Sequence, residues 1–318
     1  MDSFAGRLAV VTGGGSGMGR ELVVQLAAEG CSVATCDVNA GALAETAQLA
    51  QAGAPDGTRV TTHVADVSDE AQVNAFRDDV LAQHDTDHVD LLFNNAGIAG
   101  GGSFINAKRE EWEKTFGVCW GGVYNCARAF TPALIASDDA CMVNTSSVNG
   151  FWASLGPGMP HTAYSTAKFA VKGFSEALME DFRVNAPHVK VAVVMPGHIG
   201  TDIVTNTRMA HGTDPDAMTA EELGEVRTVM AQRGIPSDGI ADADLQQMVK
   251  MMGQMFRDSA PMTAAAAATV ILDGVRAGEW RILVGDDAHA LDSAVRAAPE
   301  KAYDADGPTL STISSVGT

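Results

Sequence analysis

The chain has 318 residues, 46% hydrophobic and 19% charged, so it can bury a sizeable core and is not disordered by composition. Its formal net charge of −19 argues against a nucleic-acid-binding surface or an anionic membrane partner. No apolar run approaches the roughly 20 residues that span a bilayer, so we expect no membrane-spanning helix.

The N-terminus and the cysteines predict a cytoplasmic protein with reduced thiols. The second residue is acidic and no basic segment follows, so the N-terminus does not resemble a secretory signal. The cysteines are odd in number and include no Cys-x-x-Cys pair, which favours buried, reduced thiols. They are Cys31, Cys36, Cys119, Cys126 and Cys141. No His/Cys/Asp cluster has metal-ligand spacing, so we expect no metal site.

Short apolar segments predict seven β-strands, because they are rich in β-branched residues and end in turn-forming residues. In chain order these are residues 7–12, 31–37, 59–66, 89–97, 140–147, 189–197 and 280–285. Between them, apolar residues recur at spacings of three and four, which predicts helices such as 19–30 and 69–84. Ser68 stands where it can cap the second of these helices.

The alternation of strand and helix predicts an α/β fold: a doubly wound parallel sheet of the Rossmann type, with about seven strands and helices on both faces. We expect a single domain over residues 1–318. Residues 202–262, here called the insertion, break the rhythm and hold eight of the 14 methionines. An insertion of this length predicts a functional lid. Residues 286–318 are expected to form a C-terminal tail whose small, polar end is mobile.

The junction between the first strand and the first helix is rich in glycine. Glycines stand at positions 13, 14, 15, 17 and 19. Glycine lets the backbone approach a ligand closely, and a helix N-terminus offers free N–H groups and a positive dipole end to a pyrophosphate. This context favours a dinucleotide site over a purely structural turn.

Two aspartates end the next two strands. Asp37 stands 18 residues after Gly19, where a carboxylate can bond both ribose hydroxyls of an adenosine and repel a 2′-phosphate. With no Arg or Lys at 36–40, NAD is preferred over NADP; alternatively, Asp37 only starts a turn or caps a helix. Asp66, followed by Val67, can accept a hydrogen bond from the adenine amino group or can be only a loop residue.

Tyr164 and Lys168 stand four residues apart in the stretch AYSTAK, so on a helix they share one face. A nearby cation favours the ionised form of a phenol, whose unperturbed pKa is about 10. Taken alone, the pair fits a solvated lysine beside a half-buried tyrosine better.

Five motifs, in this order between residues 7 and 201, together resemble the classical short-chain dehydrogenase/reductase family. They are TGxxxGxG at 12–19, NNAG at 94–97, a serine after the fifth strand at Ser147, YxxxK at 164–168, and a Pro-Gly turn with a following threonine at 196–201. The resemblance implies NAD-dependent hydride transfer between nicotinamide and a secondary alcohol or ketone. Tyr164 would act as the general base, Lys168 would favour its ionised form and bind the nicotinamide ribose, and Ser147 would hold the substrate oxygen.

The resemblance also implies which residues bind the cofactor, NAD. They are Thr12, Gly13, Gly15, Ser16, Gly17, Met18, Gly19, Asp37, Asp66, Val67, Asn94, Ala96, Gly97, Tyr164, Lys168, Pro196, Gly197, Ile199 and Thr201. The family is often dimeric or tetrameric through helices corresponding to residues 108–136 and 162–186, so we expect a homodimer or homotetramer.

Two departures from the family pattern concern the active site. Cys119 stands where the family usually has an asparagine whose main-chain carbonyl helps to hold a water in a proton relay. A backbone carbonyl survives this substitution, but the asparagine side-chain hydrogen bonds do not. Ser147 and Tyr164 are also 17 residues apart, which lengthens the loop between them by about one turn relative to the family.

That loop carries apolar side chains, which either line a substrate pocket or pack under the lid. They are Phe151, Trp152, Leu155 and Met159. His161 and His198 near the site are either proton shuttles or histidines bonded to local backbone.

The insertion indicates the substrate class. Its residues 243–256 place six apolar side chains at spacings of three and four, which predicts one apolar face. They are Leu245, Met248, Val249, Met252, Met255 and Phe256. Such a face packs on the protein or closes over a bulky, apolar alcohol or ketone. The alternatives are a catalytically impaired dinucleotide-binding sensor or scaffold, and a different chemistry such as an epimerase or dehydratase on the same fold.

Overall fold

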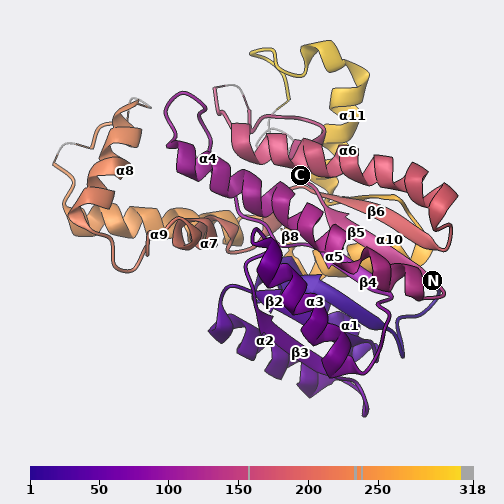
Figure 1. The fold of residues 1–318 in the computed structure, drawn as a ribbon. Helices are drawn as coiled ribbons and strands as arrows, with labels where there is room; N and C mark the ends of the chain where they lie inside the picture. Colours follow the sequence, from indigo (N-terminus) through magenta and orange to yellow (C-terminus); the bar gives the residue numbers. More distant parts are fainter. Residues whose placement is uncertain (157, 233–234, 238, 309–318) are drawn as a thin grey trace.

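The computed structural model describes residues 1–156, 158–232, 235–237 and 239–308. Its centre is a seven-stranded sheet in the order β3-β2-β1-β4-β5-β6-β9, in which every pair is parallel. The strands are β1 (Leu8–Thr12), β2 (Ser32–Asp37), β3 (Val60–Val64), β4 (Leu91–Asn94), β5 (Ala140–Thr145), β6 (Val189–Pro196) and β9 (Arg281–Val284). The predicted doubly wound sheet is confirmed (Figure 1).

Helices cover both faces of this sheet. The helices of the described residues are α1 (Gly17–Ala28), α2 (Ala40–Gly53), α3 (Glu70–His84), α4 (Arg109–Phe116), α5 (Gly122–Ala136), α6 (Thr162–Asn185), α7 (Ile203–Ala210), α8 (Ala220–Gln232), α9 (Asp242–Asp258), α10 (Ala264–Ala277) and α11 (Asp286–Ala297). A two-stranded parallel ladder, β7 (Ile199–Gly200) with β8 (Met262–Thr263), joins the two ends of the insertion.

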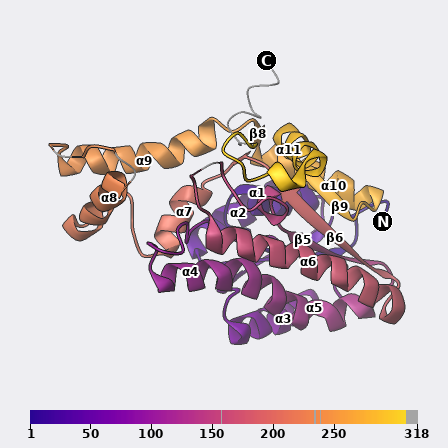
Figure 2. The same ribbon diagram turned by 90° about the horizontal axis from the view of Figure 1, so that it is seen from above.

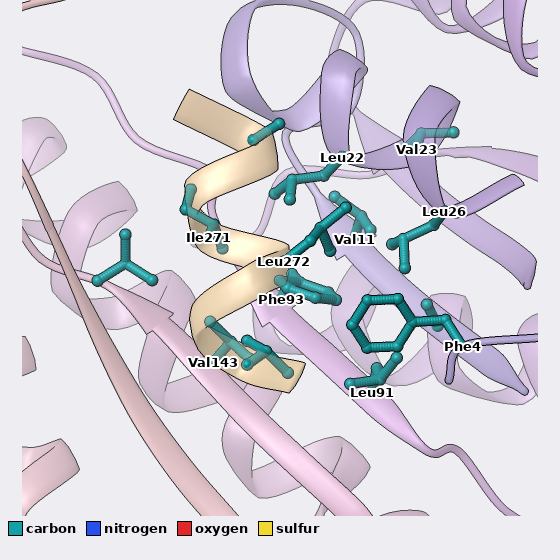
Figure 3. Close-up of a cluster of buried hydrophobic side chains, with 14 of the residues drawn as sticks. Phe4, Val11, Leu22, Val23, Leu26, Leu91, Phe93, Val143, Ile271 and Leu272 are labelled. Carbon is teal, nitrogen blue, oxygen red and sulfur yellow. The ribbon is translucent and has the colours of Figure 1, made fainter. Parts of the chain in front are cut away.

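Two hydrophobic cores follow from the alternation of side chains along the strands. Val11 and Phe93 point to the side covered by α1 and α10, as Figure 3 shows. Val10 and Leu92 point to the opposite side, which α3, α5 and α6 cover. Because the central strands are buried on both faces, they are continuously apolar in sequence.

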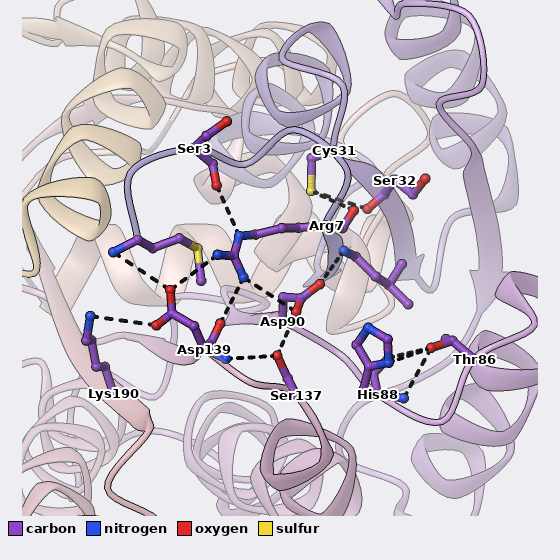
Figure 4. Close-up of polar contacts among 12 residues, drawn as sticks. Ser3, Arg7, Cys31, Ser32, Thr86, His88, Asp90, Ser137, Asp139 and Lys190 are labelled. Atoms are coloured by element: carbon purple, nitrogen blue, oxygen red, sulfur yellow. Dashed lines mark hydrogen bonds and ion pairs between the residues drawn. The ribbon is translucent and has the colours of Figure 1, made fainter.

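A polar network ties together the amino-terminal ends of the central strands (Figure 4). The buried Asp90 carboxylate accepts hydrogen bonds from the Leu8 N–H at 2.8 Å and from the Ser137 hydroxyl at 2.7 Å. Arg7 lies 3.6 Å from Asp90 and 3.2 Å from Asp139. This end of the sheet is therefore closed by structural contacts, and the opposite, carboxyl-terminal end carries the predicted motifs.

The prediction that Ser68 caps the helix after β3 is wrong. Asp69 is the cap, since its carboxylate accepts hydrogen bonds from the N–H groups of Ala71 and Gln72. The Ser68 hydroxyl instead donates to Asp66 at 2.7 Å.

The insertion contributes α7, α8 and α9. Both views show α8 and the adjoining part of α9 extending away from the sheet and its covering helices, with α7 closer to them (Figures 1 and 2). After β9 the chain forms α11 and a short helical turn, Pro299–Lys301. Most of the tail end expected to be mobile, residues 309–318, lies outside the described residues. In the part of the chain that the structure describes, no helix combines the length and apolarity needed to cross a membrane.

Candidate active site

The glycine loop forms a cradle without side chains at the carboxyl end of β1. Gly13 has a φ of +69°, and a Cβ there would lie 2.8 Å from the Ala96 Cα. At Gly15, a Cβ would lie 2.8 Å from the Asp37 carboxylate. A Cβ at either position would collide with these groups, so this turn requires glycine, and the turn leads into the N-terminus of α1, which fits a dinucleotide pyrophosphate.

Asp37 at the end of β2 is fixed beside this loop. Its carboxylate accepts hydrogen bonds from the Gly15 N–H and from the Asn39 N–H, each at 3.0 Å. The contact with Asn39 forms the local turn that was the alternative interpretation of Asp37. The contact with Gly15 places the Asp37 charge next to the cradle. Arg20 of α1 also contacts the loop, through the Gly15 carbonyl, but its charge is paired with Glu45 at 2.7 Å.

The NNAG segment joins the ends of β1 and β4. The Thr12 hydroxyl accepts hydrogen bonds from the N–H groups of Asn95 and Ala96, each at 3.0 Å. The Asn94 side chain points into the protein and donates to Asn144 at 2.8 Å, and Asn144 donates to Ser175 of α6. The Asn94 side chain is therefore buried and bonded inside the protein.

Asp66 and Val67 lie in the turn after β3. The Asp66 carboxylate accepts hydrogen bonds from the N–H and the hydroxyl of Ser68, so it already has local partners. Val67 is buried, and its carbonyl accepts a hydrogen bond from the Asn125 side chain at 3.0 Å.

Ser147, Tyr164 and Lys168 come together where β5 ends beside α6. The Lys168 Nζ is buried, donates to the Thr145 carbonyl at 2.9 Å and lies 5.3 Å from the centre of the Tyr164 ring. The solvated lysine that was the alternative for this pair is therefore wrong. The Ser147 hydroxyl accepts a hydrogen bond from the Asn149 N–H at 3.1 Å, which fixes its position.

Burial controls the charge state of this pair. Burial raises the pKa of Tyr164, the nearby Cys119 raises it further, and a hydrogen bond with Ser147 opposes the rise. Burial lowers the pKa of Lys168, and Cys119 opposes that shift. The phenol is therefore more firmly protonated in this structure than an exposed tyrosine, although a lysine stands beside its ring.

Cys119 lies in a π-helical turn, Gly117–Gly121, between α4 and α5. Its thiol is fully buried and donates to the Ile98 carbonyl at 3.0 Å. A Cβ on Gly97 would lie 3.5 Å from the Lys168 Nζ and 3.7 Å from the Cys119 Sγ, so the thiol and the ammonium border the same space. Single π-turns of this kind are frequent at functional sites.

Two of the four apolar side chains of the loop after Ser147, Phe151 and Trp152, pack differently from both alternatives given above. Trp152 is buried against Ala288 and Leu291 of α11, and its indole N–H donates to the Ala302 carbonyl at 2.8 Å. Phe151 packs against the same cluster. Trp152 therefore packs against the C-terminal segment, because that segment returns to this side of the sheet through β9.

The two histidines near the site differ in their contacts. His198 contacts the Phe256 carbonyl through Nε2 at 2.7 Å, so it is bonded to backbone as one alternative predicted, but to a distant residue rather than to local backbone. The His161 ring centre lies 4.7 Å from that of Tyr164, and burial lowers the pKa of His161 to about 4. His161 is therefore a neutral ring against the tyrosine at neutral pH.

A model of the family described as short chain dehydrogenase matches residues 7–212, which contain the glycine loop, Ser147, Tyr164 and Lys168. The chain belongs to the short-chain dehydrogenase family. The family binds a nicotinamide dinucleotide, and the protein is accordingly an oxidoreductase of this type.

Relatives and solved structures of this family cover nearly the whole chain. SadH of Mycobacterium tuberculosis is 35% identical over 296 residues, which are 93% of this chain and 92% of SadH. A short-chain dehydrogenase/reductase from Burkholderia phymatum in complex with NAD has a TM-score of 0.74 and 28% identity, and the match covers 97% of this chain and 99% of that one. A metagenomic short-chain oxidoreductase in complex with NADP has a TM-score of 0.54 and 25% identity, over 82% of this chain and 96% of that one.

Sequence reasoning missed the contacts that α7 makes in this short-chain dehydrogenase. The Asn206 side chain donates to the Ser16 hydroxyl of the glycine loop at 3.0 Å. The Thr207 hydroxyl accepts a hydrogen bond from the Ala99 N–H at 2.8 Å, and Lys114 bonds the Ala210 carbonyl. The insertion therefore begins in contact with the glycine loop. Asn206 and Thr207 belong to no motif, so no sequence signal pointed to them.

Proposed function

We propose that this short-chain dehydrogenase transfers a hydride between NAD and a secondary alcohol or ketone. The observation that carries the proposal is the position of Ser147, Tyr164 and Lys168, at the same edge of the sheet as the glycine cradle. When bound, the nicotinamide ring supplies the hydride chemistry. Ser147 would hold the substrate oxygen, Tyr164 would exchange its proton with that oxygen, and Lys168 would bind the ribose and stabilise the phenolate.

The protonation state of Tyr164 is the one that carbonyl reduction requires. With its pKa raised by burial, the phenol is protonated at neutral pH and can donate its proton to a ketone oxygen. The buried ammonium of Lys168 can then stabilise the phenolate that remains. In the direction of alcohol oxidation, the positive nicotinamide ring would add to this stabilisation.

We propose NAD rather than NADP as the cofactor. Asp37 accepts a hydrogen bond from the glycine loop and projects one negative charge beside it. A 2′-phosphate placed there would be repelled, whereas ribose hydroxyls can donate to the carboxylate. The nearest arginine of the loop, Arg20, is paired with Glu45 and is not free to compensate.

We propose a bulky, mostly apolar substrate and a lid function for the insertion. The six predicted apolar residues do not act as one face: Leu245 and Val249 are buried, while Met248, Met252 and Met255 are 42%, 54% and 63% exposed. Met251, at 47%, joins the exposed set. These four methionines recur at spacings of three and four and give α9 a flexible, apolar outer strip that can adapt to an irregular ligand.

The cations of the insertion do not favour an anionic substrate. Arg227 is paired with Asp242, Lys250 with Asp216, and Arg257 with Asp202 and Asp258. Arg208 is partly buried and has no ion pair with any described residue. Arg233 lies outside the described residues.

We propose one catalytic domain that includes the insertion and the C-terminal tail, in a cytoplasmic homodimer or homotetramer formed through α4, α5 and α6. An aromatic group on α5, α6 and the π-helical turn before α5 supports that surface. Tyr124 and Phe169 are 44% and 41% exposed, and the ring centres of Trp120 and Phe174 lie 5.3 Å apart. The intact Ser147, Tyr164 and Lys168 speak against an impaired sensor, since a protein that only binds dinucleotides does not need them.

A turnover assay tests the function. The protein is incubated with NAD or NADP and a panel of secondary alcohols, or with NADH and the corresponding ketones, and NADH absorbance is followed. We expect turnover with NAD and large apolar members. Tight NADH binding without turnover of any member would favour the sensor, and a product changed without a change in NADH would favour an epimerase or dehydratase.

A further inference from the structure

The turn after β6 lies at the nicotinamide end of the proposed cofactor site. Asp37 ends β2, the glycine loop follows β1 and Ser147 follows β5, so a dinucleotide would lie across the sheet edge in that order. β6 is the next strand beyond β5, and its turn begins with Pro196 and Gly197. The following segment returns to the loop, since a Cβ on Gly17 would lie 3.1 Å from the Thr201 side chain.

One side chain, far away in sequence, holds this turn. The Asp287 carboxylate, at the start of α11, accepts a hydrogen bond from the His198 N–H at 2.6 Å. The same carboxylate fills the space beside Gly197, where a Cβ would overlap both of its oxygens. The Gly197 N–H donates to the Val284 carbonyl of β9 at 2.9 Å, so the turn is fixed from the same side at two successive residues.

The carboxylate is costly for the fold. Asp287 is 5% exposed, and its Oδ1 is buried without a hydrogen-bond partner among the described residues. A buried charge with an unpartnered oxygen destabilises a protein, and the N-terminus of α11 offsets only part of that cost. Such a group in a native structure calls for an explanation other than stability.

We propose that Asp287 is a positioning residue for the cofactor, which holds the 196–199 turn in the conformation that receives the nicotinamide half of NAD. This inference rests on the proposed function. The Asp287 carboxylate accepts the hydrogen bond from His198 and occupies the space beside Gly197. These two contacts together determine where the backbone of the turn lies. Without these contacts the turn relaxes toward α11. The nicotinamide half of NAD then loses its contacts with the turn, while the adenosine half keeps its contacts with the protein.

The test compares two ligands that differ at the nicotinamide end. Dissociation constants of NADH and of ADP-ribose, which lacks nicotinamide, are measured by calorimetry for wild type and Asp287→Ala. Asp286→Ala is the matched control, because Asp286 is the exposed carboxylate next in the chain. We expect Asp287→Ala to raise the dissociation constant of NADH about tenfold or more, as for loss of a hydrogen bond to a charged group. The dissociation constant of ADP-ribose should change less than about twofold. Asp286→Ala should bind both ligands as wild type does.

Several results would overturn the inference. If Asp287→Ala binds NADH as wild type does, or loses ADP-ribose to the same extent, Asp287 does not act on the nicotinamide end. If that variant does not fold, amide hydrogen exchange of His198 in the wild-type protein decides: protection that NADH increases supports the proposal, and an unprotected amide, or protection that NADH does not change, contradicts it. Wild-type protein that binds neither ligand would contradict the proposed function itself.

Discussion

Asp37 is the single side chain that we expect to set the preference between NAD and NADP. Asp37→Ala should weaken NADH binding by about tenfold to a hundredfold, because the ribose hydroxyls lose a charged acceptor, and should leave NADPH binding equal or better. Adding Val38→Arg, at the exposed neighbouring position, should reverse the preference. Fluorescence titration with both cofactors measures this, with the exposed Asp56→Ala as control. Wild-type protein that binds NADPH more tightly than NADH would contradict the assignment.

Cys119 tests how much of the proton relay depends on a side chain. Its thiol donates only to the Ile98 carbonyl among the described residues, and a backbone carbonyl is present whichever residue stands there. We therefore expect Cys119→Asn to keep kcat within about threefold of wild type. Steady-state kinetics on protein with an unchanged Tm checks this. A loss of tenfold or more would mean that the thiol has a role of its own beside Lys168.

At the scale of elements, helix α9 and its methionines should decide substrate size. A double variant, Met252→Gln with Met255→Gln, removes apolar surface that is now exposed and that we expect a bulky substrate to cover. Since burying an apolar side chain contributes about 1.5–3 kcal/mol, kcat/KM for large apolar alcohols should fall about tenfold or more. The value of kcat/KM for a short secondary alcohol should stay within about twofold of wild type.

The control for this variant is Leu49→Gln, an exposed apolar position on α2 outside the insertion. The measurement is kcat/KM over a size series of secondary alcohols with NAD. Equal losses for small and large alcohols, or a wild-type preference for short polar or anionic members, would exclude a role of α9 in covering an apolar substrate.

The same elements show how far the sequence could predict the structure. The sequence identifies β4 by its continuous apolar residues and β1 by the glycine loop that follows it. These strands in turn identify the edge of the sheet at which Ser147 and Tyr164 meet. The predicted face of α9 was only partly right, because residues 203–232 decide which of its sides is covered. Trp152 and Asp287 could not be placed, since their partners lie more than 85 residues away along the chain.

For the whole molecule, two partly buried histidines predict an acid-sensitive fold. Burial lowers the pKa of His161 and of His84 to about 4. The unfolded chain protonates such residues near pH 6.5, so between about pH 6.5 and 4 it binds more protons than the folded protein. The contribution of these histidines to the free energy of unfolding should therefore be fully present above pH 6.5. It should be lost as the pH is lowered through this window.

Urea unfolding at about pH 7 and pH 5 measures this effect. His161→Gln should reduce the loss. Because one pKa unit corresponds to about 1.4 kcal/mol and only the range from about pH 6.5 to 5 is sampled, the share of His161 is at most about 2 kcal/mol. The exposed His289→Gln is the control. A variant at His161 with the same pH dependence as wild type would show that this imidazole is not held neutral in the folded protein.

The most direct test of the whole mechanism is the turnover of Tyr164→Phe with NADH and a bulky ketone, measured together with its NADH dissociation constant. The ring stays in place against Lys168 and His161, and only the proton and oxygen of the phenol are removed. We predict that kcat falls by about a hundredfold or more, as expected for loss of a general acid, while the NADH dissociation constant stays within about threefold of wild type. A variant that keeps most of its turnover would contradict the role of Tyr164, and with it the proposed reaction at this site.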